Sequence, residues 1–332
     1  MPERLNHTER LQALIEGLKP DRPPVAMWRH FYPDENYHTQ FAEAMIDWQK
    51  QFDWDFLKIN PKASYHYEPW GVRMKLSPDS VTKPVRIRPA VTQLSDWANV
   101  QPLPVTHSEF DAQLRSIVLI RKALPRPFRI VMTVFNPISV AGDMVESDDV
   151  LLAHLHESPQ IVERALLAIQ STFVHLVHEF RNAGADGIFF ATTQWASADH
   201  LTLDEVRRFG IAIDRPVWDA AGADAFNVLH ICDRNNYLKE YSDFKAALTN
   251  WDASDPTNPT LGDAFEFLRR PVMGGIAHET DLISDTPGIL RDKVRRLIAT
   301  HRGIPLAVGP GCAIPVTVPM ENVQTVRDAV ER

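Results

Sequence analysis

The chain contains 332 residues, of which 44% are hydrophobic and 23% are charged, and it carries a formal net charge of -8. This composition excludes a disordered or fibrous chain, and an acidic chain without a stripe of basic and aromatic residues is not expected to bind nucleic acid. No apolar run reaches the ~18 residues of a membrane span and the charged amino terminus lacks an export signal, so we expect a cytoplasmic protein without membrane contact.

Short apolar runs rich in Val, Ile and Phe alternate along the chain with segments that carry apolar residues at helical spacing. This alternation is typical of β/α units around a parallel sheet. The expected strands, in chain order, are 25–30, 56–60, 129–135, 187–193, 226–232, 246–251, 271–277 and 305–309. Eight such strands predict a (β/α)8 TIM barrel, and barrels often exceed 250 residues as one unit. We therefore expect residues 1–332 to form a single domain.

Two of the intervening helices have recognisable ends. Ser158 and Pro159 supply a cap and a first-turn proline for a long amphipathic helix that should end at Gly184. Thr202 and Glu205 form a capping-box pattern, which predicts the start of the next helix.

The connection between the second and third expected strands is longer than a β/α unit needs. Its first part, about residues 62–105, is rich in proline and contains the sequence MKLSPDSVTKPVRIR, which predicts a small hairpin. A helix at 106–124 should follow. We expect this insertion to lie over the mouth of the barrel and to bring Tyr65 and Trp70 near a ligand, because it leaves the carboxyl end of a strand.

Candidate functional residues follow from the fold, because the active site of such a barrel lies at the carboxyl ends of its strands. Arg29 and Asp252 are predicted to take part in catalysis. The predicted substrate contacts are Trp28, His30, Asn60, Tyr65, Gln194 and Trp195. The aromatic members of this set could equally belong to the core.

His230 and Cys232 share one face of the fifth expected strand, because side chains alternate along a strand with a period of two. Cys312, the other cysteine of the chain, follows the last expected strand. One imidazole and two thiolates suit Zn²⁺ and leave a fourth position for an acid, water or substrate. On spacing alone a second interpretation stays open, in which His230 is a hydrogen-bonded core histidine and both cysteines are small structural side chains.

Longer segments resemble a known family. RPPVAMWRH near the start, GADGIFFATTQWAS in the middle, FNVLHIC, and the closing GPGCAIPVTVPMENVQTVRDAVE are similar to the uroporphyrinogen decarboxylase superfamily. Within it, the chain most resembles the zinc-dependent methyltransferases that act on methylcobamides and thiols, whose signature is His-x-Cys followed by a distant Cys. His230, Cys232 and Cys312 match this signature, so the resemblance implies that these residues bind zinc.

The resemblance also implies an activity. Zinc would activate a thiol, or an ether or phenol oxygen, for methyl transfer to or from a corrinoid held by a separate protein. Asp252 is spaced like the acidic ligand of the related cobalamin-independent methionine synthases and could complete the metal site, with Glu279 as its competitor. Asp252 could equally cap a helix or orient His230.

Two other functions stay open. The first is a metal-free decarboxylase of the uroporphyrinogen type, in which Arg29 holds a carboxylate. Only one arginine of that family's Arg-Gln-Ala-Gly-Arg motif is present in the corresponding stretch, Met27 to Phe31, which weakens this alternative. The second is a barrel that binds a small molecule without turnover. The sequence does not determine the oligomeric state, so a homodimer also stays open.

Overall fold

The computed structural model describes residues 4–331. At its centre, these residues form a curved sheet of seven parallel strands in the order β1-β4-β5-β6-β7-β8-β9. The strands are β1 (Leu57–Ile59), β4 (Ile130–Phe135), β5 (Gly187–Thr192), β6 (Val228–Ile231), β7 (Leu248–Trp251), β8 (Val272–Ile276) and β9 (Leu306–Pro310). They are buried on both faces, which explains why they appear in the sequence as nearly continuous apolar runs.

The prediction of an extended strand at 25–30 is wrong. Only Val25 pairs with the sheet, through a single parallel bridge to Val308 of β9. On its other side, the carbonyl of Val25 accepts a hydrogen bond of 3.0 Å from the Asp55 amide just before β1. The segment therefore lies between the two edge strands of the sheet, but it contributes one bridge where an eighth strand was predicted.

The sequence around Val25 explains this difference. Pro23 and Pro24 lack amide protons, so they cannot donate to a neighbouring strand. The carbonyl of Met27 accepts a hydrogen bond of 2.9 Å from the indole of Trp48 rather than from a strand. Strand pairing is therefore limited to the hydrogen bonds that the Pro24 carbonyl and the Ala26 amide make with Val308.

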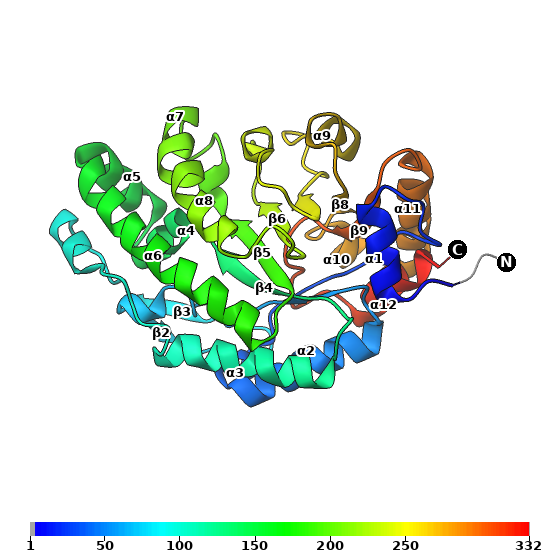
Figure 1. Cartoon of the computed structure of the whole chain (residues 1–332), viewed down its shortest axis with the longest axis horizontal. Helices are drawn as coiled ribbons and strands as arrows, with labels where there is room; N and C mark the ends of the chain where they lie inside the picture. The colour runs from blue at the N-terminus through cyan, green and yellow to red at the C-terminus, as the bar shows by residue number, and fades with distance from the viewer. Residues whose placement is uncertain (1–3, 332) are drawn as a thin grey trace.

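Helices lie outside the strands in Figure 1. Neighbouring pairs such as α12 and α2, α2 and α3, and α3 and α6 contact one another around the sheet. The helices are α1 (His7–Ile15), α2 (His38–Phe52), α3 (Ser108–Ala123), α4 (Pro137–Met144), α5 (Asp148–Glu157), α6 (Pro159–Ala183), α7 (Leu203–Glu205), the π-helix η5 (Val206–Ile211), α8 (Ala212–Asp219), α9 (Leu261–Leu268), α10 (Asp281–Ser284), α11 (Pro287–Thr300) and α12 (Met320–Ala329). Short 3-10 turns are η1 (Asp34–Asn36), η2 (Glu68–Trp70), η3 (Leu94–Asn99), η4 (Gln194–Ala196) and η6 (Leu238–Tyr241).

The predicted helix ends are confirmed. Helix α6 begins at Pro159 and stops before Gly184, whose φ of 124° favours glycine. Thr202 and Glu205 make the reciprocal hydrogen bonds of a capping box at the start of α7. Helix α3 occupies the expected range 106–124 to within two residues.

The hairpin predicted between the second and third expected strands is confirmed. Strands β2 (Arg73–Lys75) and β3 (Val85–Arg88) pair antiparallel and form a separate two-stranded sheet. The guanidinium of Arg86 donates to the carbonyls of Asp143 and Glu146, so the hairpin packs against the end of α4. Helix α4 follows β4, and the hairpin is therefore attached on the carboxyl side of the sheet.

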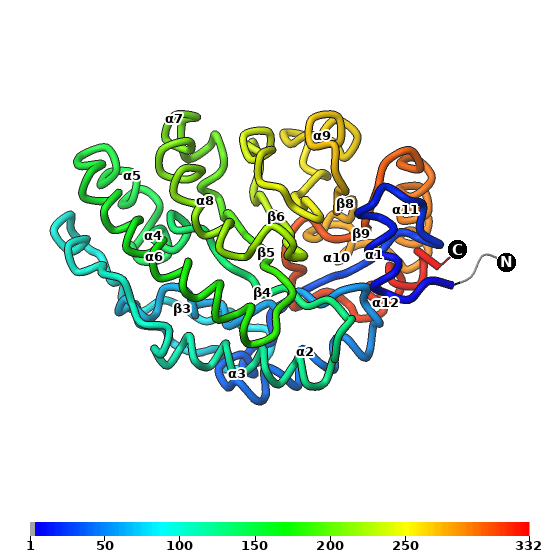
Figure 2. Tube along the Cα trace, viewed as in Figure 1, coloured from blue at the N-terminus to red at the C-terminus, as the bar shows by residue number. Residues whose placement is uncertain are grey.

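The two ends of the described chain meet at one side of the molecule, as Figure 2 shows. The guanidinium of Arg4 is 3.2 Å from the carboxylate of Glu331, and Arg22 pairs with the same carboxylate at 2.8 Å. A connected hydrophobic core extends from Leu11 in α1 to Val330 after α12. Among residues 4–331, no helix is both long and apolar enough to cross a membrane.

Candidate metal centre

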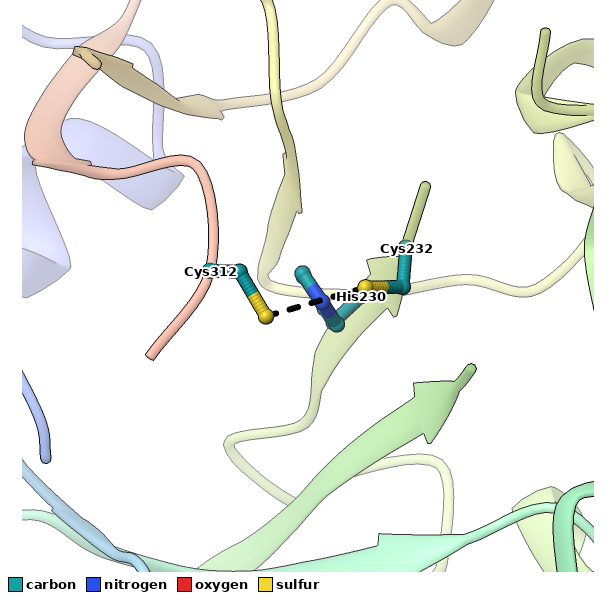
Figure 3. A group of neighbouring side chains, drawn as sticks. All are labelled: His230, Cys232 and Cys312. Carbon is teal, nitrogen blue, oxygen red and sulfur yellow. Dashed lines mark hydrogen bonds between the residues drawn. The ribbon is translucent and has the colours of Figure 1, made fainter. Parts of the chain in front are cut away.

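The residues of the predicted metal site come together at the carboxyl ends of β6 and β9 (Figure 3). His230 is the third residue of β6 and Cys232 follows the strand directly, so their side chains share one face. Cys312 lies in the loop after β9. The donor atoms of the three residues all lie within 4.8 Å of one another, and the two sulfurs are 3.6 Å apart as free thiols.

The loop that carries Cys312 approaches β7 closely because Gly311 has no side chain. A Cβ atom at this position would stand 2.6 Å from Cγ of Asp252, a distance that real Cβ atoms do not reach. Glycine therefore allows the loop to lie against the end of β7, next to the cysteine of β6.

Asn250 determines the tautomer of His230. The two residues are register partners on β7 and β6, and Oδ1 of Asn250 lies 2.7 Å from Nδ1 of His230. The amide nitrogen of Asn250 donates to the carbonyls of Met273 and Pro310, so its oxygen is the atom left to accept a proton. Nδ1 of His230 must then carry the hydrogen, and Nε2 keeps its lone pair for the thiol side.

The two thiols have opposite acidities. The pKa of Cys312 is well below its ordinary value, chiefly because the Cys232 thiol donates a hydrogen bond to its sulfur, while burial opposes this effect. The same hydrogen bond, together with burial, raises the pKa of Cys232. The hydrogen bond between the two thiols therefore favours ionisation of Cys312 over that of Cys232, and a thiolate is the form that ligates metals.

The acidic residues predicted near the metal do not join this group. Asp252 accepts hydrogen bonds from Ser254 through Oδ1, and its Oδ2 is 3.8 Å from Nδ1 of His278. Among the described residues, the donor group within 4.8 Å contains only the histidine and the two cysteines. Glu279 is exposed. The orienting partner of His230 is Asn250, and not Asp252 as one interpretation of the sequence had it.

The predicted residues of the 25–30 segment lie around the same interior. Trp28 is buried, with its ring edge-on to Phe189 of β5. Arg29 is half-buried, with its guanidinium over the ring of Phe31, and burial lowers its pKa. His30 forms a hydrogen bond of 3.0 Å between its Nδ1 and Oε2 of Glu35.

The first strand adds a lysine that the sequence analysis did not select. Lys58 of β1 is buried and its ammonium bonds to Oδ1 of Asn60, the predicted substrate contact. Burial lowers the pKa of Lys58 to about 7, and the negative charge at Cys312 works in the opposite direction. The signal in the sequence was the spacing, because residues 58 and 60 of a strand share a face.

Tyr65 and Trp70 were both predicted to lie near a ligand, and the structure shows that each packs against neighbouring elements. Tyr65 is fully buried. Its hydroxyl donates a hydrogen bond to the carbonyl of Thr133 in β4, and this bond stabilises the strand. Trp70 packs against Phe110 and Phe173 and donates to Gln101. The ring of Trp70 is therefore engaged by α3 and α6, and its approach to a ligand stays a prediction.

The last two predicted contacts follow β5. Gln194 donates to both carboxylate oxygens of Asp148 at 3.1 Å. Trp195 is buried against α4, where a Cβ at Gly142 would stand 2.3 Å from its indole nitrogen, and that nitrogen has no hydrogen-bond partner. Trp195 therefore serves the packing of α4, while Gln194 remains half-exposed.

Fold and site together define an α/β protein with a curved parallel sheet and a candidate thiol-imidazole metal centre at the strand ends. The sequence matches the uroporphyrinogen decarboxylase (URO-D) family model over residues 35–332, so the chain belongs to this family. This confirms the similarity inferred from the sequence.

Solved structures agree on the fold. A methyltransferase from Methanosarcina mazei aligns with a TM-score of 0.84 at 19% identity, covering 98% of each chain. A B12-independent methionine synthase from Shewanella sp. W3-18-1 aligns with a TM-score of 0.59 at 14% identity, covering 93% of this chain and 95% of that one. No curated protein matches the sequence.

Proposed function

We propose that the protein is a zinc-dependent methyltransferase that activates a thiol, or an ether or phenol oxygen, for methyl transfer to or from a corrinoid. The observation that carries this proposal is the convergence of His230, Cys232 and Cys312, with the second nitrogen of the imidazole already engaged by Asn250. Family membership and the fold shared with a methyltransferase support it.

The three side chains fit zinc. Two sulfur ligands of a tetrahedral zinc ion, each about 2.3 Å from the metal, lie roughly 3.8 Å apart, and the sulfurs of Cys232 and Cys312 are separated by 3.6 Å. His230 would contribute Nε2, which leaves the fourth position for the substrate. When bound, zinc would lower the pKa of a thiol or act as a Lewis acid on an oxygen.

The chain's own residues then position the reactants. In the thiol reaction, the substrate sulfur forms a bond to the methyl carbon while the donor's bond to that carbon breaks and its electron pair stays with the donor. Asp252, beside the Cys312 loop, would accept the proton released by the thiol. Arg29 would orient the substrate, and the corrinoid would be supplied by a separate protein.

The test begins with metal content. Purified protein should contain about one zinc per chain, and Cys232→Ser and Cys312→Ser should each weaken zinc binding by at least about ten-fold, because a hydroxyl is a poor substitute for a thiolate. Zinc is measured by atomic emission and by competition with a chelator. Methylation of a thiol by a methylcorrinoid should be lost together with the metal.

Asp252→Asn provides the control for metal binding, because its carboxylate lies outside the donor group; this variant should keep its zinc and lose activity. The competing function, a metal-free decarboxylase, predicts the reverse pattern. In that case Arg29→Ala would abolish activity and Cys312→Ser would have little effect. Full zinc content in both cysteine variants would also overturn the proposal.

A further inference from the structure

Lys58 is a buried cation in the interior of the sheet. Its side chain is 4% exposed, and its ammonium nitrogen lies 4.5 Å from the ring centre of Phe189 and 5.3 Å from that of Trp28. The aromatic faces stabilise the positive charge only in part, because a cation-π contact replaces little of the hydration that burial removes. An isolated buried ammonium is costly unless another group compensates it.

No carboxylate pairs with Lys58 among residues 4–331. Lys62, four residues further on, shows the usual arrangement, since its ammonium lies 2.9 Å from Glu68 and 2.9 Å from Glu109. The ammonium of Lys58 instead donates to Oδ1 of Asn60. That single bond leaves two of its three protons without an acceptor.

Asn60 adds a second unused donor at the same place. It is also 4% exposed, and because its oxygen accepts from Lys58, its amide nitrogen remains buried without a hydrogen-bond partner. Buried polar groups without partners are rare in folded proteins and call for an explanation. Two adjacent residues therefore present only donors and a positive charge to the interior.

This donor pair lies beside the candidate metal centre. The ring of Phe189 contacts both sides, since its centre is 4.5 Å from the Lys58 ammonium and 5.3 Å from the His230 ring centre. A small molecule held at the metal centre would thus have an anion-attracting position within reach.

We propose that Lys58 and Asn60 form an oxyanion-binding subsite, and that the substrate of the methyl transfer carries a carboxylate or a similar acidic oxygen group in addition to the sulfur or oxygen that reacts. This inference rests on the proposed function for the identity of the reacting atom. One acidic oxygen accepts from the ammonium and a second accepts from the amide, which satisfies both buried donors. Trp28 and Phe189 form apolar walls beside them.

The experiment compares thiol acids with their uncharged amides. The probes are mercaptoacetate, 3-mercaptopropionate and 4-mercaptobutyrate, each paired with its amide and titrated into the zinc-loaded protein by calorimetry. At least one acid should bind about ten-fold more tightly than its amide, because hydrogen bonds to charged groups contribute that much. Lys58→Met should abolish this preference and Asn60→Leu should reduce it.

Lys62→Met is the matched control, because it removes a neighbouring lysine that already has carboxylate partners; it should keep the preference for the acid. Thermal unfolding establishes that each variant is folded. The subsite is wrong if acids and amides bind equally to the wild-type protein, or if Lys62→Met has the same effect as Lys58→Met.

A titration with propionate separates this inference from the proposed function. If thiol amides bind in a manner that depends on Cys312 but acids gain nothing, the metal site stands and the subsite fails. If no thiol binds, but propionate binds to the chelator-treated wild-type protein and not to Lys58→Met, the subsite stands and the proposed function fails.

Discussion

Asn250 acts on the metal centre without belonging to it. It uses both protons of its amide nitrogen on the carbonyls of Met273 and Pro310, so its oxygen can only accept from His230. The orientation of the imidazole is therefore fixed by the backbone of β8 and β9, which lie two and three strands away from β6. A histidine held in this way does not have to lose rotational freedom when it binds a metal.

Asn250→Ala should weaken zinc binding by about 10- to 100-fold, because the imidazole loses the partner that fixes its tautomer. Two buried carbonyls lose their donors as well, so the free energy of unfolding should fall by about 1–3 kcal/mol. Zinc affinity is measured by chelator competition and stability by urea unfolding.

Asn322→Ala separates these two effects. Asn322 is equally buried and also donates to two carbonyls, those of Leu282 and Asp285, away from the metal centre. It should lose similar stability and keep its zinc affinity. A comparable loss of zinc affinity in both variants would show that Asn250 acts only through general stability.

At the scale of single residues, the sequence predicts those parts of the site that depend on local spacing. His230 and Cys232 are two residues apart on one strand, so their common face follows from the strand period. The role of Asn250 depends on the register between β6 and β7, which no local pattern specifies. Whether a carboxylate lies near Lys58 depends on how distant segments fold around it. Local spacing therefore does not predict that Lys58 lacks a carboxylate partner.

The segment from η5 to α8 contains a buried carboxyl group outside the candidate metal centre. Asp214, in the first turn of α8, is fully buried and accepts hydrogen bonds from Asn136 at 3.1 Å and Tyr241 at 3.0 Å. Its other oxygen has no partner. Burial raises the pKa of Asp214 to about 7, although both hydrogen bonds favour the charged form.

Asp214 should therefore make stability depend on pH. Between pH ~4 and ~7 the carboxyl group of Asp214 is ionised in the unfolded chain but protonated in the folded chain. Its contribution to the free energy of unfolding is therefore complete below pH ~4 and is lost as the pH rises to ~7. Asp214→Asn removes this loss. The free energy of unfolding of the variant, relative to that of wild type, should therefore be about 1–3 kcal/mol higher at pH 8 than at pH 5.

Urea unfolding at both pH values measures this difference. Asp219→Asn removes the same charge from the exposed end of α8 and should leave the pH dependence as it is in wild type. An unchanged slope in Asp214→Asn would mean that Asp214 is already ionised in the folded protein at pH 5.

At the scale of elements, prediction succeeds where one local signal dominates. The strands from β4 to β9 are buried on both faces, so their apolar runs are long and their ranges were predictable. The range 25–30 has the same apolar character but follows two prolines, and the carbonyl of Met27 bonds to the Trp48 side chain. Its failure to pair along its length depends on a helix that packs over it, and the strand pattern does not contain that information.

Asp55 and Lys58, two buried charged residues at β1, differ in how their charges are compensated. At the amino end of β1, Asp55 is fully buried and surrounded by Arg10 and Arg22, each 2.7 Å away, and by His7, which keep its pKa at about 2 despite burial. Lys58, in the middle of β1, lacks such a partner. The buried charge of Asp55 is therefore compensated before β1 begins, whereas the buried ammonium of Lys58, within β1, has no carboxylate partner among the described residues.

The ion pair between Arg4 and Glu331 brings the two ends of the described chain side by side. A short glycine-serine linker could join the two ends, and new ends could be opened in the exposed loop 222–224, which precedes β6 at the amino rim, whereas Cys232 follows β6 at the opposite rim. Such a circular permutant should fold and bind zinc as the parent does, as circular dichroism and chelator competition would show. A permutant opened inside α6, at Phe173, should not fold, because that cut falls in the buried face of the helix. The chain would then begin and end with β/α units from the middle of the present sequence, and its former ends would become an ordinary surface loop.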